Sequence, residues 1–314
     1  MDGVIARAGP RRFPAVHLAL FLATVATTLW AGYGLSPSAA HPPTVPDVVR
    51  GGLPFAASLV AILLAHEMGH YLVALAHGVR ATLPYFIPVP FGAGTLGAVI
   101  RLRSQLPSRR AALDIAAAGP LAGLAVAIPL LLWGIAHSEV QAVSGPAVGS
   151  ALASPFALLQ ALLKGAPLVS GEPTVQYFGD SLLTLAAAWL VHGTLPPGTD
   201  LVLHPVAFAA WLGLLVTTLN LMPMGQLDGG HVLYALLGRR RAHAGSRLVS
   251  AALLLAGLFL SWNWLVWWLV TRSVLGLGHP PAALEEPLDP ARGAVALVSL
   301  LLFALTFVPV PVSF

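Results

Sequence analysis

Long apolar runs, separated by short segments rich in arginine, proline and glycine, dominate the pattern of this chain. A helix rises 1.5 Å per residue, so about 20 residues cross a hydrocarbon core about 30 Å thick. Six runs approach or exceed this length, at residues 15–35, 54–78, 111–136, 205–238, 248–270 and 293–312. The pattern predicts an all-α polytopic membrane protein with about six transmembrane helices.

The first run has two interpretations. Arg7, Arg11 and Arg12 precede it and residues 38–40 resemble a cleavage site, as in a secretory signal peptide. Its apolar stretch is longer than the roughly 7 to 15 residues of a signal peptide. We therefore expect an uncleaved first transmembrane helix.

Two intervals do not follow the pattern of spans. Prolines and glycines interrupt residues 82–105, where the stretch from Leu96 to Arg103 has strand propensity. We expect a small re-entrant β-hairpin there, shielded by protein because lipid cannot satisfy free backbone groups. Residues 138–203 are mixed, with moderately apolar stretches at 147–169 and 181–192. We expect short helices on the outer face there; a further pair of spans is the alternative.

Composition excludes a soluble domain and several chemistries. Hydrophobic residues make up 57% of the chain and charged residues 9%, whereas a soluble protein has roughly 25% charged residues. The chain contains no cysteine, which rules out disulfides, thiol catalysis and cysteine-based metal sites. A metal must therefore be held by histidine and carboxylate side chains. The net charge is +4, and most of the charged residues flank the apolar runs, so nucleic acid is not an expected partner.

The positive charges predict an orientation. With the N-terminus inside and six alternating spans, twelve of the sixteen basic residues fall on the inner side. The inner set is Arg7, Arg11, Arg12, Arg80, Arg101, Arg103, Arg109, Arg110, Arg239, Arg240, Arg241 and Arg247. The outer set is Arg50, Lys164, Arg272 and Arg292. This asymmetry obeys the positive-inside rule, so both termini are expected in the cytoplasm.

The second run carries the chemistry. His66-Glu67-Met68-Gly69-His70 interrupts an otherwise apolar helix, and residues four apart lie about 40° apart on one helical face. His66 and His70 can therefore chelate one Zn²⁺, and Glu67 can serve as general base and then general acid. This is the HExxH pattern of zinc hydrolases. The alternative is a polar patch that only packs helices together, which ionisable groups at bilayer depth make costly.

A third ligand is needed, and zinc hydrolases commonly use a carboxylate. Asp114 and Asp228 are the other acids within the apolar runs. Asp114 lies four residues after Arg110, where an interfacial ion pair explains it better. Asp228 precedes Arg239 by 11 residues, and the two histidines precede Arg80 by similar distances. If both segments run helically to one boundary, the three side chains lie at one depth, and Asp228 is the expected ligand.

Further candidates accompany these residues. Asn220 lies eight residues before Asp228 and is expected either to hydrogen-bond the substrate backbone or oxyanion, or to satisfy carbonyls freed near Pro223. His77 and His231 are expected to pack rather than to tune the metal. Other histidines, among them His279, lie in loops or at helix ends, where solvated rings are the default. Four tryptophans at 262–268 predict an aromatic belt at the outer interface.

These motifs resemble those of the site-2 proteases, a family of intramembrane zinc metalloproteases. The matching stretches are HEMGH at 66–70, NLMPMGQLDGGH at 220–231 and Gly119-Pro120, while residues 84–103 are similar to a subgroup that includes plastid members. The resemblance implies cleavage of membrane-tethered proteins, often after an earlier protease has shortened them. The PDZ domains frequent in the family have no counterpart in the sequence.

The sequence thus predicts three regions and leaves two other functions open. Residues 1–53 form an N-terminal arm, first helix and external loop; residues 54–240 form the metalloprotease core; residues 241–314 form two further spans. A metal or solute carrier would show repeated halves, and an inactive relative would have lost a site residue. The expected location is a bacterial inner membrane, in contact with lipid.

Overall fold

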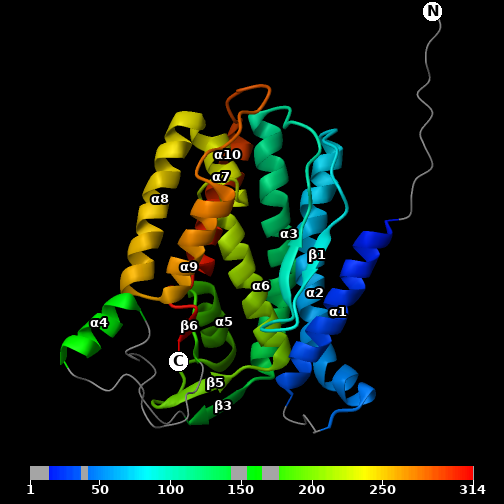
Figure 1. Ribbon diagram of the computed structural model, residues 1–314, viewed down its shortest axis with the longest axis vertical. Coiled ribbons are helices and arrows are strands. Elements are labelled where there is room, and N and C mark those ends of the chain that lie inside the picture. Colours follow the sequence, from blue (N-terminus) through cyan, green and yellow to red (C-terminus); the bar gives the residue numbers. More distant parts are fainter. Residues whose placement is uncertain (1–13, 37–41, 143–153, 165–176, 314) are drawn as a thin grey trace, which may run out of the picture.

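The computed structural model describes residues 14–36, 42–142, 154–164 and 177–313, and it is mostly helical (Figure 1). Part of the apolar stretch expected at 147–169 lies outside the described residues. The helices are α1 (Ala15–Gly34), α2 (Val45–Ala76), α3 (Arg109–Ala136), α4 (Pro155–Lys164), α5 (Leu182–His192), α6 (Pro205–Leu221), α7 (Asp228–Leu237), α8 (Arg239–Phe259), α9 (Trp262–Val270) and α10 (Pro290–Thr306), with a π-helical turn at Thr271–Leu275.

Helices α2, α3 and α6 form the centre of the bundle. Ile62, Leu131 and Leu214 meet in a buried apolar cluster that joins them. Helices α2 and α3 approach closely because Gly69 of α2 faces the Ala118 carbonyl of α3. A Cβ at Gly69 would lie 2.5 Å from that oxygen. Small residues at such crossings allow backbones to meet, and this contact brings the HExxH segment against the middle of α3.

The number of six membrane spans is not confirmed. Within the described residues, four helices, α1, α2, α3 and α8, are long and apolar enough to cross a membrane by length and composition. Helices α6 and α10 are apolar but have 17 residues each. Helix α2 begins at Val45, so residues 45–53, which were expected to belong to a loop, are helical. The Thr44 side chain accepts from the Asp47 amide and the Asp47 side chain accepts from the Thr44 amide, which starts the helix early.

The expected fifth span, residues 248–270, is wrong as a single helix. Helix α8 ends at Phe259, Ser261 caps the start of α9, and α9 turns back so that Gly257 lies against the backbone of Leu265. Trp264 is buried against Phe307 and donates a hydrogen bond to the Pro309 carbonyl. The expected aromatic belt is therefore wrong for Trp264.

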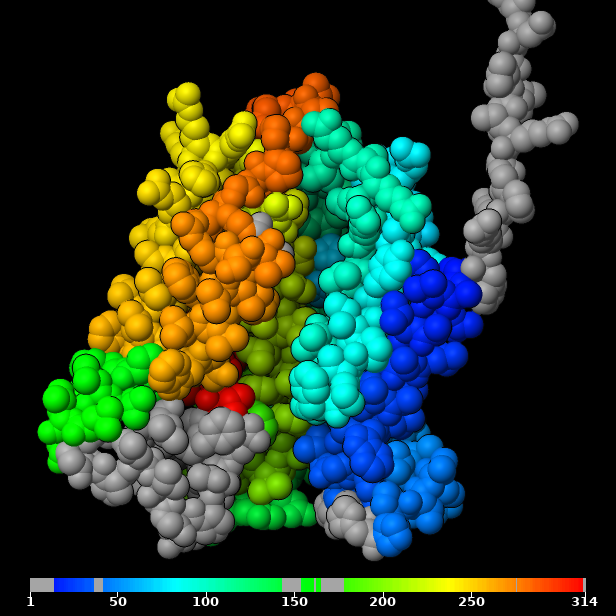
Figure 2. Space-filling view, viewed as in Figure 1, coloured from blue at the N-terminus to red at the C-terminus, as the bar shows by residue number. Residues whose placement is uncertain are grey.

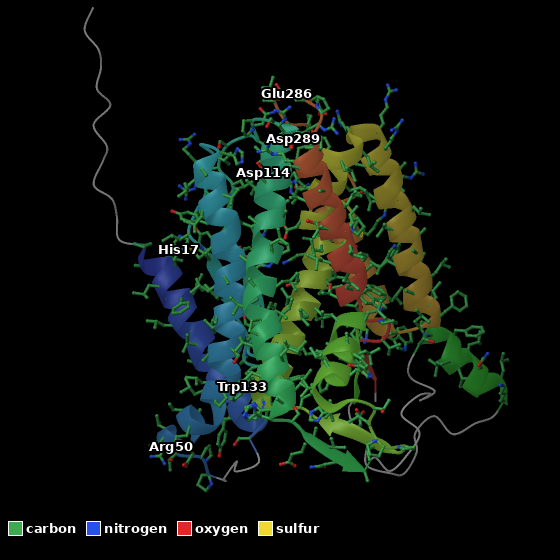
Figure 3. All side chains as sticks on the ribbon, turned by 180° about the vertical axis from the view of Figure 1, so that it is seen from behind. His17, Arg50, Asp114, Trp133, Glu286 and Asp289 are labelled. Carbon is green, nitrogen blue, oxygen red and sulfur yellow. The ribbon has the colours of Figure 1, made fainter. Side chains whose placement is uncertain are left out.

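This reversal changes the placement of the C-terminal part. The segment of residues 276–289, called the strap below, reaches the end of the bundle where α3 begins, and α10 starts there. Arg292 pairs with Asp114 at 2.8 Å, and Figure 3 shows Asp114, Glu286 and Asp289 at one end and Arg50 and Trp133 at the other. The prediction that Arg292 lies on the side opposite Arg109 is wrong.

The two ends of the described chain consequently lie at opposite ends of the bundle. Helix α1 starts in the half of the bundle where α2 finishes, and the His17 ring donates a hydrogen bond from Nδ1 to the Pro84 carbonyl there (Figure 3). Helix α10 runs away from that end, and its C-terminal strand lies far from it (Figure 1). The described residues therefore do not support the prediction that both termini lie on one side of the membrane, because the turn between α8 and α9 adds one reversal of chain direction.

Short antiparallel strand pairs complete the fold. Strand β1 (Tyr85–Pro88) pairs with β2 (Thr95–Val99) in the hairpin that the sequence predicts, with a bulge between Phe86 and Pro88. Helix α1 packs along it, where Thr27 donates to the Gly94 carbonyl. Elsewhere β3 (Glu139–Ala142) pairs with β5 (Thr199–Val202), and β4 (Tyr177–Phe178) pairs with β6 (Val312–Ser313). Whether the hairpin re-enters the membrane stays a prediction.

Candidate metal centre

Three side chains from two distant segments converge in the middle of the bundle. His66 and His70 project from one face of α2, and Asp228 begins α7 after the non-helical segment 222–227. The Asp228 Oδ2 atom lies 3.4 Å from His66 Nε2 and 3.2 Å from His70 Nε2, and the two Nε2 atoms are 3.1 Å apart. One ligand atom from each residue lies within 4.8 Å of the others. The arrangement can hold one metal ion between two nitrogens and one oxygen.

The orientation of His70 is fixed from behind. Its Nδ1–H donates to the Ile115 carbonyl of α3 at 2.7 Å. A neutral ring with the proton on Nδ1 carries a lone pair on Nε2, the atom that faces Asp228 and His66. This is the usual way in which a backbone carbonyl sets the tautomer of a metal-binding histidine.

Glycines on α3 leave room for the imidazoles. A Cβ at Gly119 would lie 2.1 Å from His70 Nε2, so a side chain and the present ring position exclude each other. At Gly123 the nearest atoms belong to His66 and would lie 3.3 Å away. Gly119 therefore faces the site itself.

Glu67 lies beside the three converging side chains, next to a cavity of about 240 Å³. Its carboxylate accepts a hydrogen bond from the backbone N–H of Ile100, directly after β2. His66, Glu67 and His70 are all buried. Ala98 and Leu227 line the cavity on two sides, and Figure 2 shows a hollow between the hairpin and the segment of α9 and the strap. A substrate carbonyl in this cavity would lie near both the acid and the donor set.

Asn220 also faces the site. It lies in the last turn of α6, lines the cavity, and places Nδ2 3.3 Å from His66 Nε2. Of the two roles that its position left open, this placement favours contact with a bound group. Its amide points at the cluster.

Asp114 and His77 lie outside the centre. Arg292 Nε–H is shared between the two carboxylate oxygens of Asp114, Nη2 donates to Oδ2, and His77 Nε2 lies 3.0 Å from the same Oδ2. Arg110, its expected partner, instead lies 3.8 Å from Glu286. The expected Arg110–Asp114 pair is therefore wrong, and this acid joins α3 to α10.

His279 is the residue that sequence reasoning missed. Its Nε2 lies 2.5 Å from Nδ1 of His231, which lines the cavity, and its ring stacks on Tyr234 with centroids 4.0 Å apart. Burial lowers the pKa of His279, which favours a neutral ring at pH 7. The expectation of a solvated loop histidine is wrong. No local pattern marks it, because His231 and Tyr234 lie 45 or more residues away in the sequence.

Comparison with known proteins agrees with this geometry. The model of peptidase family M50 matches residues 54–263, which include all three converging side chains and Glu67. The chain belongs to peptidase family M50. This is the site-2 protease family whose motifs the sequence resembles.

Curated relatives of this chain are named as probable zinc metalloproteases. The chain is 30% identical over 270 residues to the probable chloroplastic zinc metalloprotease EGY2 of Arabidopsis thaliana, covering 85% of this chain and 43% of the relative. It is 30% identical over 319 residues to the probable chloroplastic zinc metalloprotease EGY1 of Oryza sativa subsp. japonica, covering 94% of this chain and 50% of the relative. The chain thus spans about half the length of these M50 relatives. No solved structure matches it.

Proposed function

We propose that this chain is an intramembrane zinc metalloprotease that hydrolyses peptide bonds within or near transmembrane segments of membrane-tethered proteins. One Zn²⁺ per chain is held by His66, His70 and Asp228. The observation that carries the proposal is the convergence of these three donors with Glu67 at a buried cavity. Two imidazoles and one carboxylate are a donor set of catalytic zinc sites that leave a position open.

The residues divide the work of hydrolysis. When bound, the metal supplies Lewis acidity that polarises the scissile carbonyl and activates a water. Glu67 takes a proton from the attacking water and delivers it to the leaving amine. Asn220 donates its amide hydrogen to the carbonyl oxygen as negative charge develops there. The Ile115 carbonyl keeps the His70 ring in the tautomer that binds metal.

Strand β2 offers an extended substrate a place beside Glu67. A transmembrane helix hides its peptide bonds, so the substrate must unwind before hydrolysis. Residues 98–100 line the cavity, and Leu96 is exposed on the same strand. An unwound segment can pair with this edge by β-addition. The alternative role of the β1–β2 hairpin is a plug that shields the site from lipid. Its packing along α1 is compatible with this role too.

The orientation follows from charge. The end of the bundle near Asp114 carries Arg80, Arg109, Arg239 and neighbouring arginines, so we place this end in the cytoplasm. The N-terminal end of α1 then faces the cytoplasm and β6 the opposite side. The compartment expected from the sequence, a bacterial inner membrane, stays a prediction; the curated relatives are named chloroplastic.

Two other functions are weaker. A carrier is disfavoured by membership in a peptidase family. An inactive relative is disfavoured because Glu67 and the three donors are all present and lie together. A substrate shortened beforehand by another protease is part of the proposal, since the family resemblance implies it.

The test uses the full chain in lipid vesicles with a tethered single-span substrate. Wild type should cut within the membrane segment, and a zinc chelator should abolish the cut. Glu67→Gln should lower turnover by about 10² to 10⁴ because a positioned base is lost, with zinc content unchanged. Cleavage at the wild-type rate by Glu67→Gln would contradict the role of the base.

Asp228→Ala gives the matched control for the metal. The zinc content of purified protein, measured by elemental analysis, should fall well below one ion per chain in this variant. An unchanged zinc content would show that the third ligand lies elsewhere. Turnover and zinc content together separate a lost base from a lost metal.

A further inference from the structure

The first turn of α7 carries the expected third ligand, Asp228, and its own sequence has a low helix propensity. Asp228 is followed by Gly229 and Gly230, and the N-cap residue Leu227 makes no side-chain capping hydrogen bond. Glycine is a poor helix former because it loses the most backbone freedom. The local sequence therefore does not hold the Asp228 carboxylate in place.

The glycines are required by packing rather than by the helix. A Cβ at Gly229 would lie 1.9 Å from the Leu221 carbonyl oxygen, and one at Gly230 would lie 2.4 Å from the Gly225 oxygen. The turn is thus pressed onto segment 222–227 on one side. On its opposite side, the first turn of α7 is positioned by the residue that contacts His231. His231 lies one turn after Asp228 on the same helical face.

That contact comes from the strap, residues 276–289. His279 Nε2 lies 2.5 Å from His231 Nδ1, and its Nδ1 lies 2.6 Å from the Pro280 carbonyl. The strap is itself fixed: the amides of Ala283 and Leu284 donate to the carbonyls of Leu106 and Pro107. His279 is therefore attached to a firm support. The family match ends at residue 263, so the strap lies outside it.

A second contact anchors the strap to the same helix. The Tyr234 hydroxyl donates to Glu285 at 2.6 Å and accepts from the Ala282 amide at 2.8 Å. The Tyr234 ring stacks on His279. The strap is thus held at residues 282–285 without His279, and loss of the His279–His231 hydrogen bond leaves these contacts in place.

We propose that His279 is a positioning residue: through its hydrogen bond to His231 it holds the first turn of α7, and so the Asp228 carboxylate, against the paired imidazoles. The inference rests on the proposed metal-dependent function, because it deepens the account of the same site. Partners beyond the direct ligands typically change metal affinity or activity by about 10- to 100-fold when they are lost.

The test compares two substitutions of similar chemistry. His279→Gln places an amide where the ring has Nε2 and keeps a partner for His231. His279→Asn is shorter, reaches only to the position of Nδ1 and loses that partner. Both remove the imidazole stacked on Tyr234. Asn can keep a donor for the Pro280 carbonyl and Gln can keep the partner of His231, so weaker zinc binding by the Asn variant reports the hydrogen bond to His231. Glu286→Gln, on the exposed part of the strap, is the control for the strap as such.

Zinc affinity is measured by chelator competition, alongside the melting temperature and the kcat and KM for a tethered substrate. We expect His279→Asn to bind zinc about 10- to 100-fold more weakly and to lose kcat, and His279→Gln to stay within about threefold of wild type. In a His231→Ala background the Asn substitution should add little, because the partner is already gone.

Equal zinc affinities in the Gln and Asn variants would overturn the inference, as would a lowered melting temperature with unchanged zinc affinity. Additive effects with His231→Ala would overturn it too. The proposed function fails separately: wild type that binds zinc without cleaving any tethered substrate refutes the protease, while the Gln–Asn difference in zinc affinity still decides the role of His279.

Discussion

Gly119 shows how a single residue can decide whether the site exists. A Cβ there would lie 2.1 Å from His70 Nε2, and neither the backbone of α3 nor the ring held by Ile115 can move freely. Overpacking of a buried contact costs about 1–3 kcal/mol. We expect Gly119→Ala to weaken zinc binding by about 5- to 150-fold, as measured by chelator competition.

Gly123→Ala is the matched control, one helical turn further along α3. Its Cβ would lie 3.3 Å from His66 Cβ and Nδ1, a contact that a shift of a few tenths of an ångström relieves. Its zinc affinity should stay close to wild type. If both variants bind zinc equally well, His70 does not need the position that the structure gives it.

At the residue scale, the sequence predicts the part of the site that depends on local spacing. His66, Glu67 and His70 share one helix, and the distance of Asp228 from Arg239 places it at their depth. The Ile115 carbonyl, the Ile100 amide and His279 belong to other segments. Backbone groups carry no signature of residue type, and a loop histidine resembles any other, so only the fold brings them to the site.

At the scale of elements, apolar runs predict where helices lie better than where they turn. The interruption before Asp228 is readable because proline and glycine mark it. The turn between α8 and α9 is not, because Leu260 and Ser261 join two apolar segments without a helix breaker. The hairpin of β1 and β2 is readable because alternating strand-prone residues follow a cluster of prolines and glycines.

The start of α10 gives a prediction about pH. Asp289 caps this helix, and hydrogen bonds from the Arg292 amide and guanidinium hold the pKa of Asp289 below its ordinary value. Since the folded pKa is lowered, the stabilisation is present above about pH 4 and is lost as the pH falls through the folded pKa. Asp289→Asn keeps a capping oxygen but removes the charge.

We therefore expect Asp289→Asn to melt about 2 °C below wild type at pH 7 in detergent, and the difference to shrink as the pH falls below about 4 and through the lowered pKa of folded Asp289. Glu286→Gln should not change the melting temperature, because its partner Arg110 lies 3.8 Å away and both side chains are about half exposed. A difference that does not shrink at all as the pH is lowered from 7 would show that the cap, rather than the charge of Asp289, sets the stability.

For the whole molecule, the structure places the strap and the start of α10 at the same end as the loop between α7 and α8. The prediction of six alternating spans places the strap and the start of α10 at the end opposite the loop between α7 and α8, because it counts residues 248–270 as one crossing. The discrepancy arises from one turn at residues 260–261. This turn reverses the chain direction, and so it changes the end of the bundle predicted for the strap and for the start of α10. Topology is therefore the feature least predictable from hydropathy alone.

The absence of native cysteine makes this arrangement directly testable. Single cysteines at Arg240, Glu286 and Gln141 can be labelled with a membrane-impermeant maleimide in sealed vesicles of known orientation. The structure predicts that Glu286→Cys and Arg240→Cys react from one side, since the strap meets the start of α3 there, and that Gln141→Cys on β3 reacts from the other. Labelling of Glu286→Cys from the same side as Gln141→Cys would restore six alternating spans and would remove the strap from the end of the catalytic cavity.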